Sequence, residues 1–431
     1  MEYTIEDILE IIQEEEVEFL YLQFTDIFGV VKNIAITGDE IHIALKGELT
    51  FDGSSIDGFI RVQENEMFLK PDLSTFVIYP WRGNFGREAR VICNIYNEDD
   101  TPFKGDSRYV LQSVLDEASS MGYSFFVGPE CEFYLFHTDS NGKPTLTTHD
   151  DAGYFDLAPV DLGENARRDM VVTLKKMGFE VEASHHEVAP GQHEIDLKKD
   201  KATLAADKIV TFKTIVRKVA RNHGLHATFM PKPLFKEAGS GMHLNFSMYK
   251  DGRDAFKGDF KGGLSIDAMY FIGGVLKHAK GICAITNPTV NSYKRLTSGY
   301  EAPFNIAWSF KNKGPLIRVP AIVESKDIKI EIRNPDPSCN PYLAFAVILK
   351  AGIDGIKNKT MPDNPIEEGG SLDKLPSSLE SAIDELANDI VIKDALKGHI
   401  FKTFVEAKKI EFEDYRSRIT SWEIEKYLTK F

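Results

Sequence analysis

Two glutamates separated by one residue stand in a segment that is otherwise largely apolar. Between residues 125 and 136 most odd positions are apolar, whereas Glu130 and Glu132 occupy successive even positions. Because side chains alternate along a strand, both carboxylates would project from one face, about 7 Å apart. A solvated strand face carries such pairs as well. However, Phe126 and Tyr134 share that face, which argues against open solvent and favours a site.

The same alternation recurs in two later segments, 241–249 and 328–333. The polar positions are His243, Asn245, Ser247 and Tyr249 in the first segment and Lys329, Glu331 and Arg333 in the second. The first follows the run Gly239-Ser240-Gly241, which leaves room for a ligand to approach the backbone. Viewed alone, a single histidine is more often structural than functional, and a charged row fits a solvated edge strand.

A third source of carboxylates is the segment SHHEVAPGQHEID. Its Glu187 and Glu194 lie on either side of a Pro-Gly turn that can fold them toward each other. With the strands above, this gives five carboxylates and one imidazole. Ligation rich in oxygen with one histidine suits Mg²⁺ or Mn²⁺, whereas zinc prefers more histidine or cysteine. The residues therefore predict a site for hard divalent cations.

Basic side chains follow in the same half of the chain. They are Arg295, Lys311, Lys313, Arg318, Lys329 and Arg333. Metals among carboxylates with cations nearby are what phosphoryl transfer from a metal-nucleotide requires, because the cations stabilise the developing charge. The chain has no Walker A sequence, kinase glycine-rich loop or Rossmann fingerprint, so none of those standard motifs would hold the nucleotide.

The elements that must position these residues fall into two groups. A helix is predicted near residues 5–15, capped by Thr4, and strands are predicted on both sides of Asp26–Gly29 and in FVIYPW and ARVICNIYN. The polar segment 97–108 interrupts all periodicity and predicts a boundary between a small α+β domain, residues 1–100, and a large domain, residues 106–431.

The large domain is expected to alternate helices with short strands. Apolar spacing predicts helices over 204–221 and 269–279 and around 379–390, and the segment 361–378 is expected to be a loop.

The overall composition excludes several classes of protein. The chain has 431 residues with 51 basic and 66 acidic side chains, a formal charge of −15. This charge argues against nonspecific binding to nucleic acid or anionic membranes. Four widely separated cysteines suggest neither a disulfide framework nor a zinc cluster. With no signal peptide and no apolar run of about 20 residues, a cytoplasmic protein is predicted.

Six ordered motifs resemble those of one known family. They are FDGSSIDGF, GPECEF, HHEVAPGQHEID, KPLFKEAGSGMHLNFS, NSYKRLTSGYEAP and IEIRNPDPSCNPYLAF. Over essentially its whole length the chain resembles the type I glutamine synthetases of bacteria and archaea, and its length resembles the shorter subgroup that is not adenylylated and is restrained by its product. The resemblance implies an α+β fold, with a small β-grasp-like N-terminal domain and a large C-terminal domain whose curved antiparallel sheet is flanked by helices.

The implied activity is ATP-dependent ligation of ammonia to L-glutamate through a γ-glutamyl phosphate, giving glutamine, ADP and phosphate. It would use two or more Mg²⁺ or Mn²⁺ ions per subunit. The Asp52 loop would reach the active site of a neighbouring subunit, so activity would need a homo-oligomer, a dodecamer of two stacked hexameric rings.

The resemblance also assigns roles to individual residues. One metal would be held by Glu132, Glu187 and Glu194, and the other by Glu130, His243 and Glu331. Arg295 would pair with the substrate α-carboxylate, the Gly239 backbone would meet its amino group, and Arg333 would face the reacting carboxylate. Asp52, Glu301 and Tyr154 would form the ammonium site, with Asp52 taking the proton and Glu301 closing the flap. Arg318 and Lys313 would join the catalytic set, Glu182, Asn245, Ser247 and Lys329 would contact the nucleotide, and Arg61 would support inhibition by product glutamine.

The chain departs from the family pattern at a few positions. Ala238 replaces the usual asparagine, and Lys311, Lys313 and Lys329 stand where arginine is usual. Lysine keeps the charge but loses the bidentate fork, so these changes put the rate in doubt, above all at the phosphoryl position Lys313. Two alternatives therefore stay open: a γ-glutamyl ligase that uses an amine, and a catalytically weak regulatory paralogue.

Overall fold

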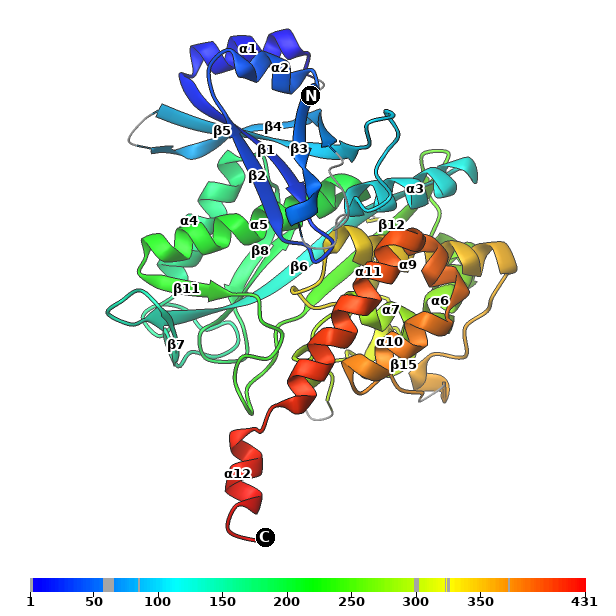
Figure 1. Ribbon diagram of the computed structural model, residues 1–431. Coiled ribbons are helices and arrows are strands. Elements are labelled where there is room, and N and C mark those ends of the chain that lie inside the picture. The colour runs from blue at the N-terminus through cyan, green and yellow to red at the C-terminus, as the bar shows by residue number, and fades with distance from the viewer. Residues whose placement is uncertain are drawn as a thin grey trace.

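The computed structural model describes residues 3–56, 66–83, 86–297, 302–321, 323, 326–370 and 373–431. Figure 1 shows a small N-terminal unit above a larger body, with the C-terminal helix projecting from the opposite end. Within the described ranges, no helix is both long enough and apolar enough to cross a membrane.

The N-terminal unit is a mixed sheet with two short helices. In spatial order its strands are β2 (Val31–Ile36), β1 (Val17–Thr25), β5 (Gly86–Tyr96), β4 (Glu66–Gly83) and β3 (Leu49–Asp52), and its helices are α1 (Ile5–Glu14) and α2 (Glu40–Leu45). The predicted first helix is confirmed, with a capping box in which Thr4 Oγ1 accepts from Asp7 N at 3.1 Å and Asp7 Oδ2 accepts from Thr4 N at 2.8 Å.

The predicted strand pair around Asp26 is also confirmed. Strands β1 and β2 pair antiparallel, and Asp26 Oδ1 accepts from both Phe28 N and Val30 N at 2.9 Å, which closes the turn.

A buried arginine joins this unit to the body. Arg108, in the first turn of α3 (Ser107–Ser120), bonds Asp207 through Nε and Nη2, both at 3.0 Å, and Asp72 of β4 through Nη2 at 2.6 Å. The second bonded carboxylate compensates for the cost of burying the guanidinium. Arg90 of β5 adds a bond to Thr211 Oγ1 at 3.3 Å, so α5 (Ala202–Asn222) is fastened beneath the N-terminal sheet (Figure 1).

The body is built on a long curved sheet. The main path runs β15 (Asn305–Ser309), β16 (Pro315–Arg318), β17 (Ile330–Ile332), β12 (Met242–Lys250), β6 (Tyr123–Thr138), β9 (Gln192–Leu197) and β8 (Val181–His186). Off this path β7 (Pro144–Thr148), β10 (Asp200–Lys201) and β11 (Leu225–Thr228) pair with β6, and β13 (Arg253–Asp254) pairs with β12. Strand β14 (Lys257–Lys261) lies outside this sheet. Apart from the parallel pair β15 and β16, the strands of the main path pair antiparallel.

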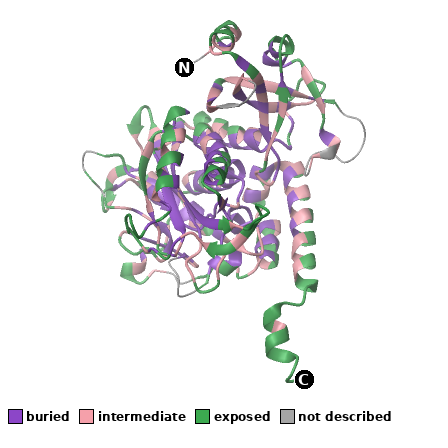
Figure 2. Cartoon of the chain, turned by 90° about the vertical axis from the view of Figure 1, so that its left-hand side faces the viewer, coloured by how far each residue is buried: buried purple, intermediate pink, exposed green. Residues whose placement is uncertain are grey.

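Helices cover one face of this sheet. In addition to α3 and α5 the helices of the body are α4 (Glu164–Lys176), α6 (Ile266–Lys277), α7 (Ala279–Thr286), α8 (Ser292–Arg295), α9 (Pro341–Asn358), α10 (Leu379–Asn388) and α11 (Ile390–Ser417), whereas α12 (Ser421–Tyr427) projects away from it (Figure 1). The alternating apolar positions of β6 and β12, such as Val127 and Phe246, are buried in one core with Phe212 of α5 and Phe345 of α9. Figure 2 shows this sheet as a buried centre and α12 as exposed.

The predicted fold class is confirmed in this two-part α+β architecture. Helices lie where the apolar spacing predicted them, at α5, α6, α10 and α11, and the segment 361–378 is mostly irregular, with a 3₁₀ turn at Ile366–Glu368. The strand predicted over 328–333 is shorter than expected, because only Ile330–Ile332 pair with neighbouring strands.

Candidate active site

Strand register gathers the predicted carboxylates on the face of the sheet opposite the helices. Glu132 on β6 lies directly across from Glu194 on β9, and Glu130 lies across from His243 on β12. Glu331 on β17 lies across from Asn245, two residues further along β12. Partners in register share a face, so four neighbouring strands contribute to one cluster.

The first group of ligand candidates contains Glu132, Glu187 and Glu194. Glu132 Oε2 accepts from Gly241 N at 2.8 Å and from Gln192 Nε2 at 3.1 Å. Burial and the neighbouring Glu187 charge raise the pKa of Glu132 to about 8, and burial together with Glu132 raises the pKa of Glu194. The protein therefore crowds carboxylates that resist losing their protons unless a cation neutralises them.

A histidine that the sequence analysis did not assign lies between two of these glutamates. His185 Nε2 is 3.3 Å from Glu194 Oε2, and Nδ1 is 3.6 Å from Glu187 Oε1. The signal was present in HHEV, because His185 and Glu187 are two residues apart at a strand end and point to one side. Asp196 was missed as well; it lies across from Glu130, and burial followed by the Glu130 charge raises its pKa to about 7.

The second group contains Glu130, His243 and Glu331. His243 Nδ1 is 3.3 Å from Glu130 Oε2 and 3.8 Å from Glu331 Oε1. Burial and the Arg333 charge lower the pKa of His243, which keeps the ring neutral, as a metal ligand must be. Asn245 Nδ2 donates to Glu130 Oε1 at 2.8 Å and so fixes the orientation of that carboxylate.

The two groups adjoin. Single donor atoms of Glu130, Glu194 and His243 all lie within 4.8 Å of one another, and those of His185, Glu187 and Glu194 do so as well. An oxygen-rich set with two imidazoles fits hard divalent cations, and the raised carboxylate pKa values indicate the charge that such ions would neutralise.

Two arginines meet at the buried carboxylate of Glu331. Arg318 and Arg333 both form ion pairs with it, and Arg333 Nε also donates to the Lys313 carbonyl at 2.9 Å. The loop that carries Lys313 is therefore tied to the second group of ligands, while the Lys313 side chain is exposed.

Arg295 occupies the space beside the glycine-rich turn. It is 3% exposed, and Nη1 donates to the Asn334 carbonyl at 2.8 Å. A Cβ at Gly241 would lie 2.5 Å from Arg295 Nη2, and one at Gly239 would lie 2.8 Å from Arg295 Cγ. The glycines were expected to leave room for a ligand; in the structure the arginine uses that room and is brought next to the carboxylates.

The nucleotide candidates lie further along the same face. Lys329 Nζ is 3.7 Å from Glu182 Oε2, and both side chains are partly or largely exposed. Ser247 is buried, with Oγ 3.4 Å from the Ile328 carbonyl. Beyond it the Phe126 and Tyr249 rings pack edge to face at 5.1 Å, so the polar face ends in an aromatic pair.

The ammonium-site candidates are divided between the two parts of the molecule. Tyr154 stacks on Phe155 at 4.0 Å and meets the His185 ring edge to face at 5.6 Å, beside the first ligand group. Asp52 lies on β3 of the N-terminal sheet, where its carboxylate accepts from Ser54 N at 2.8 Å. Glu301 and Arg61 lie outside the described residues.

Comparisons with known proteins agree on a single family. A family model described as "Glutamine synthetase, catalytic domain" matches residues 104–427, and one described as "Glutamine synthetase, beta-Grasp domain" matches residues 16–98. The second match confirms the predicted β-grasp character of the N-terminal unit.

Relatives match over the full chain. A glutamine synthetase of Clostridium saccharobutylicum is 52% identical over 441 residues, covering 100% of this chain and 99% of that protein. One of Staphylococcus aureus is 50% identical over 442 residues with the same coverage.

Solved structures share the fold. A GmaS/ADP complex has a TM-score of 0.89 at 30% identity, with complete coverage of both chains. A Plasmodium falciparum glutamine synthetase has a TM-score of 0.90 at 24% identity and covers 99% of both chains, which is evidence for the fold alone.

Proposed function

The chain belongs to the glutamine synthetase family, and we propose that the carboxylate cluster on the open face of its large sheet is the catalytic centre for ATP-dependent synthesis of glutamine from glutamate and ammonia. The observation that carries this assignment is the convergence of six ligand candidates with Arg295 and Arg333 on that one face.

Divalent cations fit the two ligand groups, and we assign two or more Mg²⁺ or Mn²⁺ ions to each subunit. When bound, such ions would supply the positive charge that offsets the phosphate charge of the nucleotide. Glu132, Glu187 and Glu194 would hold one ion, and Glu130, His243 and Glu331 the other. Glu182, Asn245, Ser247 and Lys329 remain the candidates for contacts with or near the nucleotide, which would extend from the second group toward Phe126 and Tyr249.

Arg295 and Arg333 would orient glutamate between the two groups. Arg295 would pair with the α-carboxylate near the Gly239 backbone, and Arg333 would face the side-chain carboxylate, since a guanidinium suits planar carboxylates. An oxygen of that carboxylate attacks the γ-phosphorus of ATP, the bond from phosphorus to the bridging oxygen breaks, and ADP leaves. Arg318 and Lys313 would stabilise the charge on the transferred phosphoryl group.

Ammonia then displaces the phosphate. Ammonium gives one proton to Asp52, the freed nitrogen attacks the carbonyl carbon, the carbon–oxygen bond to phosphate breaks, and the departing phosphate takes a second proton from the nitrogen. Tyr154, packed against His185, would border this site. Because Asp52 lies on the N-terminal sheet and bonds Ser54 instead of the cluster, we propose that it serves the site of a neighbouring subunit in a homo-oligomer, a dodecamer of two hexameric rings.

A single assay tests this function against its rivals. Purified protein is supplied with ATP and glutamate, and ADP release is measured with no nucleophile, with ammonium, and with methylamine or a polyamine. The proposal expects release that depends on ammonium. Release that requires an amine would favour an amine ligase, and no release would favour a weak regulatory paralogue.

A further inference from the structure

The hairpin of β8 and β9 carries a second polar cluster on the face turned away from the catalytic carboxylates. His185 lies across from Glu194, whereas the next pair in register is His186 with His193. Since side chains alternate, the two histidines of this second pair project backward. His186 and His193 are fully buried, and Asp150 and Asp161 complete the cluster at 6% and 2% exposure.

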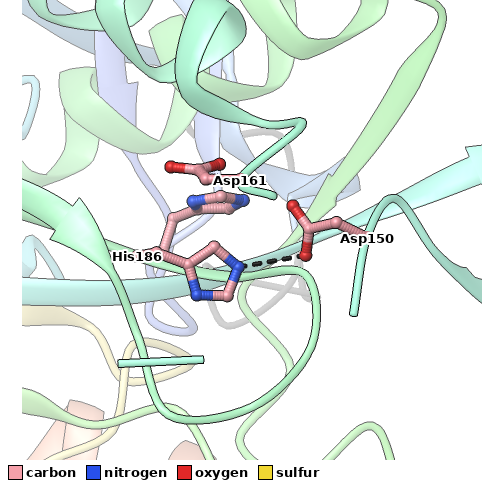
Figure 3. Close-up of side chains that lie close together, drawn as sticks. Asp150, Asp161 and His186 are labelled. Atoms are coloured by element: carbon pink, nitrogen blue, oxygen red, sulfur yellow. Dashed lines mark hydrogen bonds and ion pairs between the residues drawn. The ribbon is translucent and has the colours of Figure 1, made fainter. Parts of the chain in front are cut away.

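Asp150 connects three segments from within this cluster. Its Oδ1 accepts from Gly191 N at 2.9 Å and from His186 Nε2 at 3.0 Å, and Oδ2 accepts from Leu162 N at 3.2 Å. Figure 3 shows the His186 ring turned toward the Asp150 carboxylate, with Asp161 close by. The turn of the hairpin, the end of β8 and the loop before α4 are thus held by one carboxylate.

His186 contacts both Asp150 and the backbone of Glu187. Its Nδ1 is 2.7 Å from the Glu187 carbonyl oxygen, and because a carbonyl only accepts, Nδ1 is the donor. The His186 carbonyl accepts from Phe155 N at 3.1 Å, and Glu187 N donates to the Gln192 carbonyl at 2.7 Å. The peptide of Glu187 is therefore bonded on both sides, and one of these bonds leads to Asp150.

In the other half of the cluster Asp161 Oδ1 and His193 Nε2 are buried without a hydrogen-bond partner in the part of the chain that the structure describes, and an arginine supplies the remaining contacts. Arg167 of α4 pairs with Asp161 at 2.8 Å and with His193 Nδ1 at 2.8 Å. Its guanidinium supplies the positive charge that a cation in the cluster would otherwise bring, which argues against a third metal here. Among the described residues, Asp161 makes no hydrogen bond to His186 or to the hairpin turn, so it belongs to the same buried cluster without the link to Glu187.

We propose that Asp150 is a positioning residue that acts through His186 to hold the Glu187 carboxylate where a metal ion binds. The inference rests on the proposed function only in taking Glu187 as a metal ligand. Groups that orient metal ligands typically change metal affinity by about 10-fold to 100-fold when they are lost. An asparagine at this position loses the acceptor of the Leu162 N–H group, and its uncharged oxygen accepts more weakly from His186 and Gly191 than the carboxylate does.

The test compares Asp150→Asn with Asp161→Asn, which removes a carboxylate from the same buried cluster. Binding of Mn²⁺ to the intact oligomer is titrated by electron paramagnetic resonance of the free ion. We expect Asp150→Asn to weaken Mn²⁺ binding at least about tenfold and Asp161→Asn to change it less than about threefold. Equal effects in the two variants, or wild-type affinity in Asp150→Asn, would overturn the proposal.

A second variant interrupts the link at its other end and is used if Asp150→Asn fails to assemble. In His186→Gln the amide nitrogen can still donate to Asp150, but the bond to the Glu187 carbonyl is lost. The same weakening of Mn²⁺ binding is expected, and unchanged binding would contradict the positioning role. Since the titration needs no turnover, it gives its answer independently of whether ammonia is the nucleophile.

Discussion

Glu132 and Glu194 are direct partners across β6 and β9, and both carboxylates are more than nine-tenths buried. Two ionised carboxylates at this spacing repel each other. Burial and this repulsion raise the pKa of both groups, so the ionised forms destabilise the fold when no cation is bound. Divalent cations should therefore stabilise the native state, by about 2.7 kcal/mol at a concentration 100 times the dissociation constant. We expect EDTA to lower the melting temperature and Mg²⁺ or Mn²⁺ to restore it. A melting temperature indifferent to both treatments would count against the metal site.

The glycine beside Arg295 gives a prediction about substrate affinity. In Gly241→Ala the new methyl carbon would lie 2.5 Å from Arg295 Nη2, so the guanidinium must move away from its bonds to the backbone of Asn334 and Arg333. The KM for glutamate should rise about tenfold, with a smaller effect on the KM for ATP. Gly398→Ala, at a position where nothing lies within 4 Å of the new carbon, serves as the control and should leave both constants unchanged.

His278 predicts a dependence of stability on pH that is separate from the catalytic centre. Its Nδ1 is 2.7 Å from Asp389 Oδ2, and Nε2 is 3.1 Å from Asp354 Oδ2. Burial alone would lower the pKa of His278, but the bonds to Asp389 and Asp354 raise it above the ordinary 6.5. This stabilisation is complete below pH 6.5 and is lost as pH rises through the raised folded-state pKa.

Calorimetry of wild type and His278→Gln across that interval checks the sign. The difference in melting temperature between the two proteins should be larger at about pH 6 than at about pH 8.5. A difference that grows toward high pH would contradict the assignment of a protonated histidine between the two aspartates.

Asp52 predicts complementation between subunits. If it acts in a neighbour's site, inactive Asp52→Ala protein and inactive Glu331→Ala protein should recover part of the activity when they are dissociated and reassembled together, because some mixed interfaces then contain both native residues. Mixing without dissociation is the control and should recover nothing. Failure of verified mixed oligomers to recover any activity would place Asp52 in the site of its own subunit.

The alternation of apolar and polar residues along the strands accounts for most of the site residues that could be predicted from the sequence. Alternation in β6 and β12 placed Glu130, Glu132 and His243 on polar faces before any pairing was known, and the structure brings these faces together. Capping chemistry likewise predicted the first helix at Thr4. These are local signals, carried by neighbouring residues in the chain.

Contacts between distant segments could not be predicted in this way. The apposition of Arg295 to Gly241 depends on a helix more than 50 residues away in the sequence, and the bond from Asp150 to His186 depends on a loop 36 residues away. No local pattern marks either pair. The resemblance supplied roles for ligands but none for His185, and the contact of His185 with Glu194 depends on the way the β8–β9 hairpin closes.

The exchange of the usual arginine for Lys313 gives a prediction about the catalytic rate. Its loop is held firmly, because Lys311 N and Asn312 N both donate to Ser309 Oγ, at 3.0 and 2.6 Å, and the Lys313 carbonyl accepts from Arg333. The backbone therefore stays in place when the side chain is exchanged. In the proposed role the Lys313 ammonium would offer one charge to the transferred phosphoryl group but not two parallel N–H donors, and its strongly hydrated head would cost more to desolvate.

We expect Lys313→Arg to raise kcat about tenfold, about 1.4 kcal/mol of transition-state stabilisation, with little change in the KM for glutamate. Steady-state kinetics beside Lys175→Arg, an exposed exchange on α4, separates this effect from a general gain. If Lys313→Arg loses activity and wild type is already fast, the pocket has adapted to lysine, with Gly314 providing space for it. That result would also remove the weak-paralogue alternative, since a site reshaped around its own lysine is one that still turns over substrate.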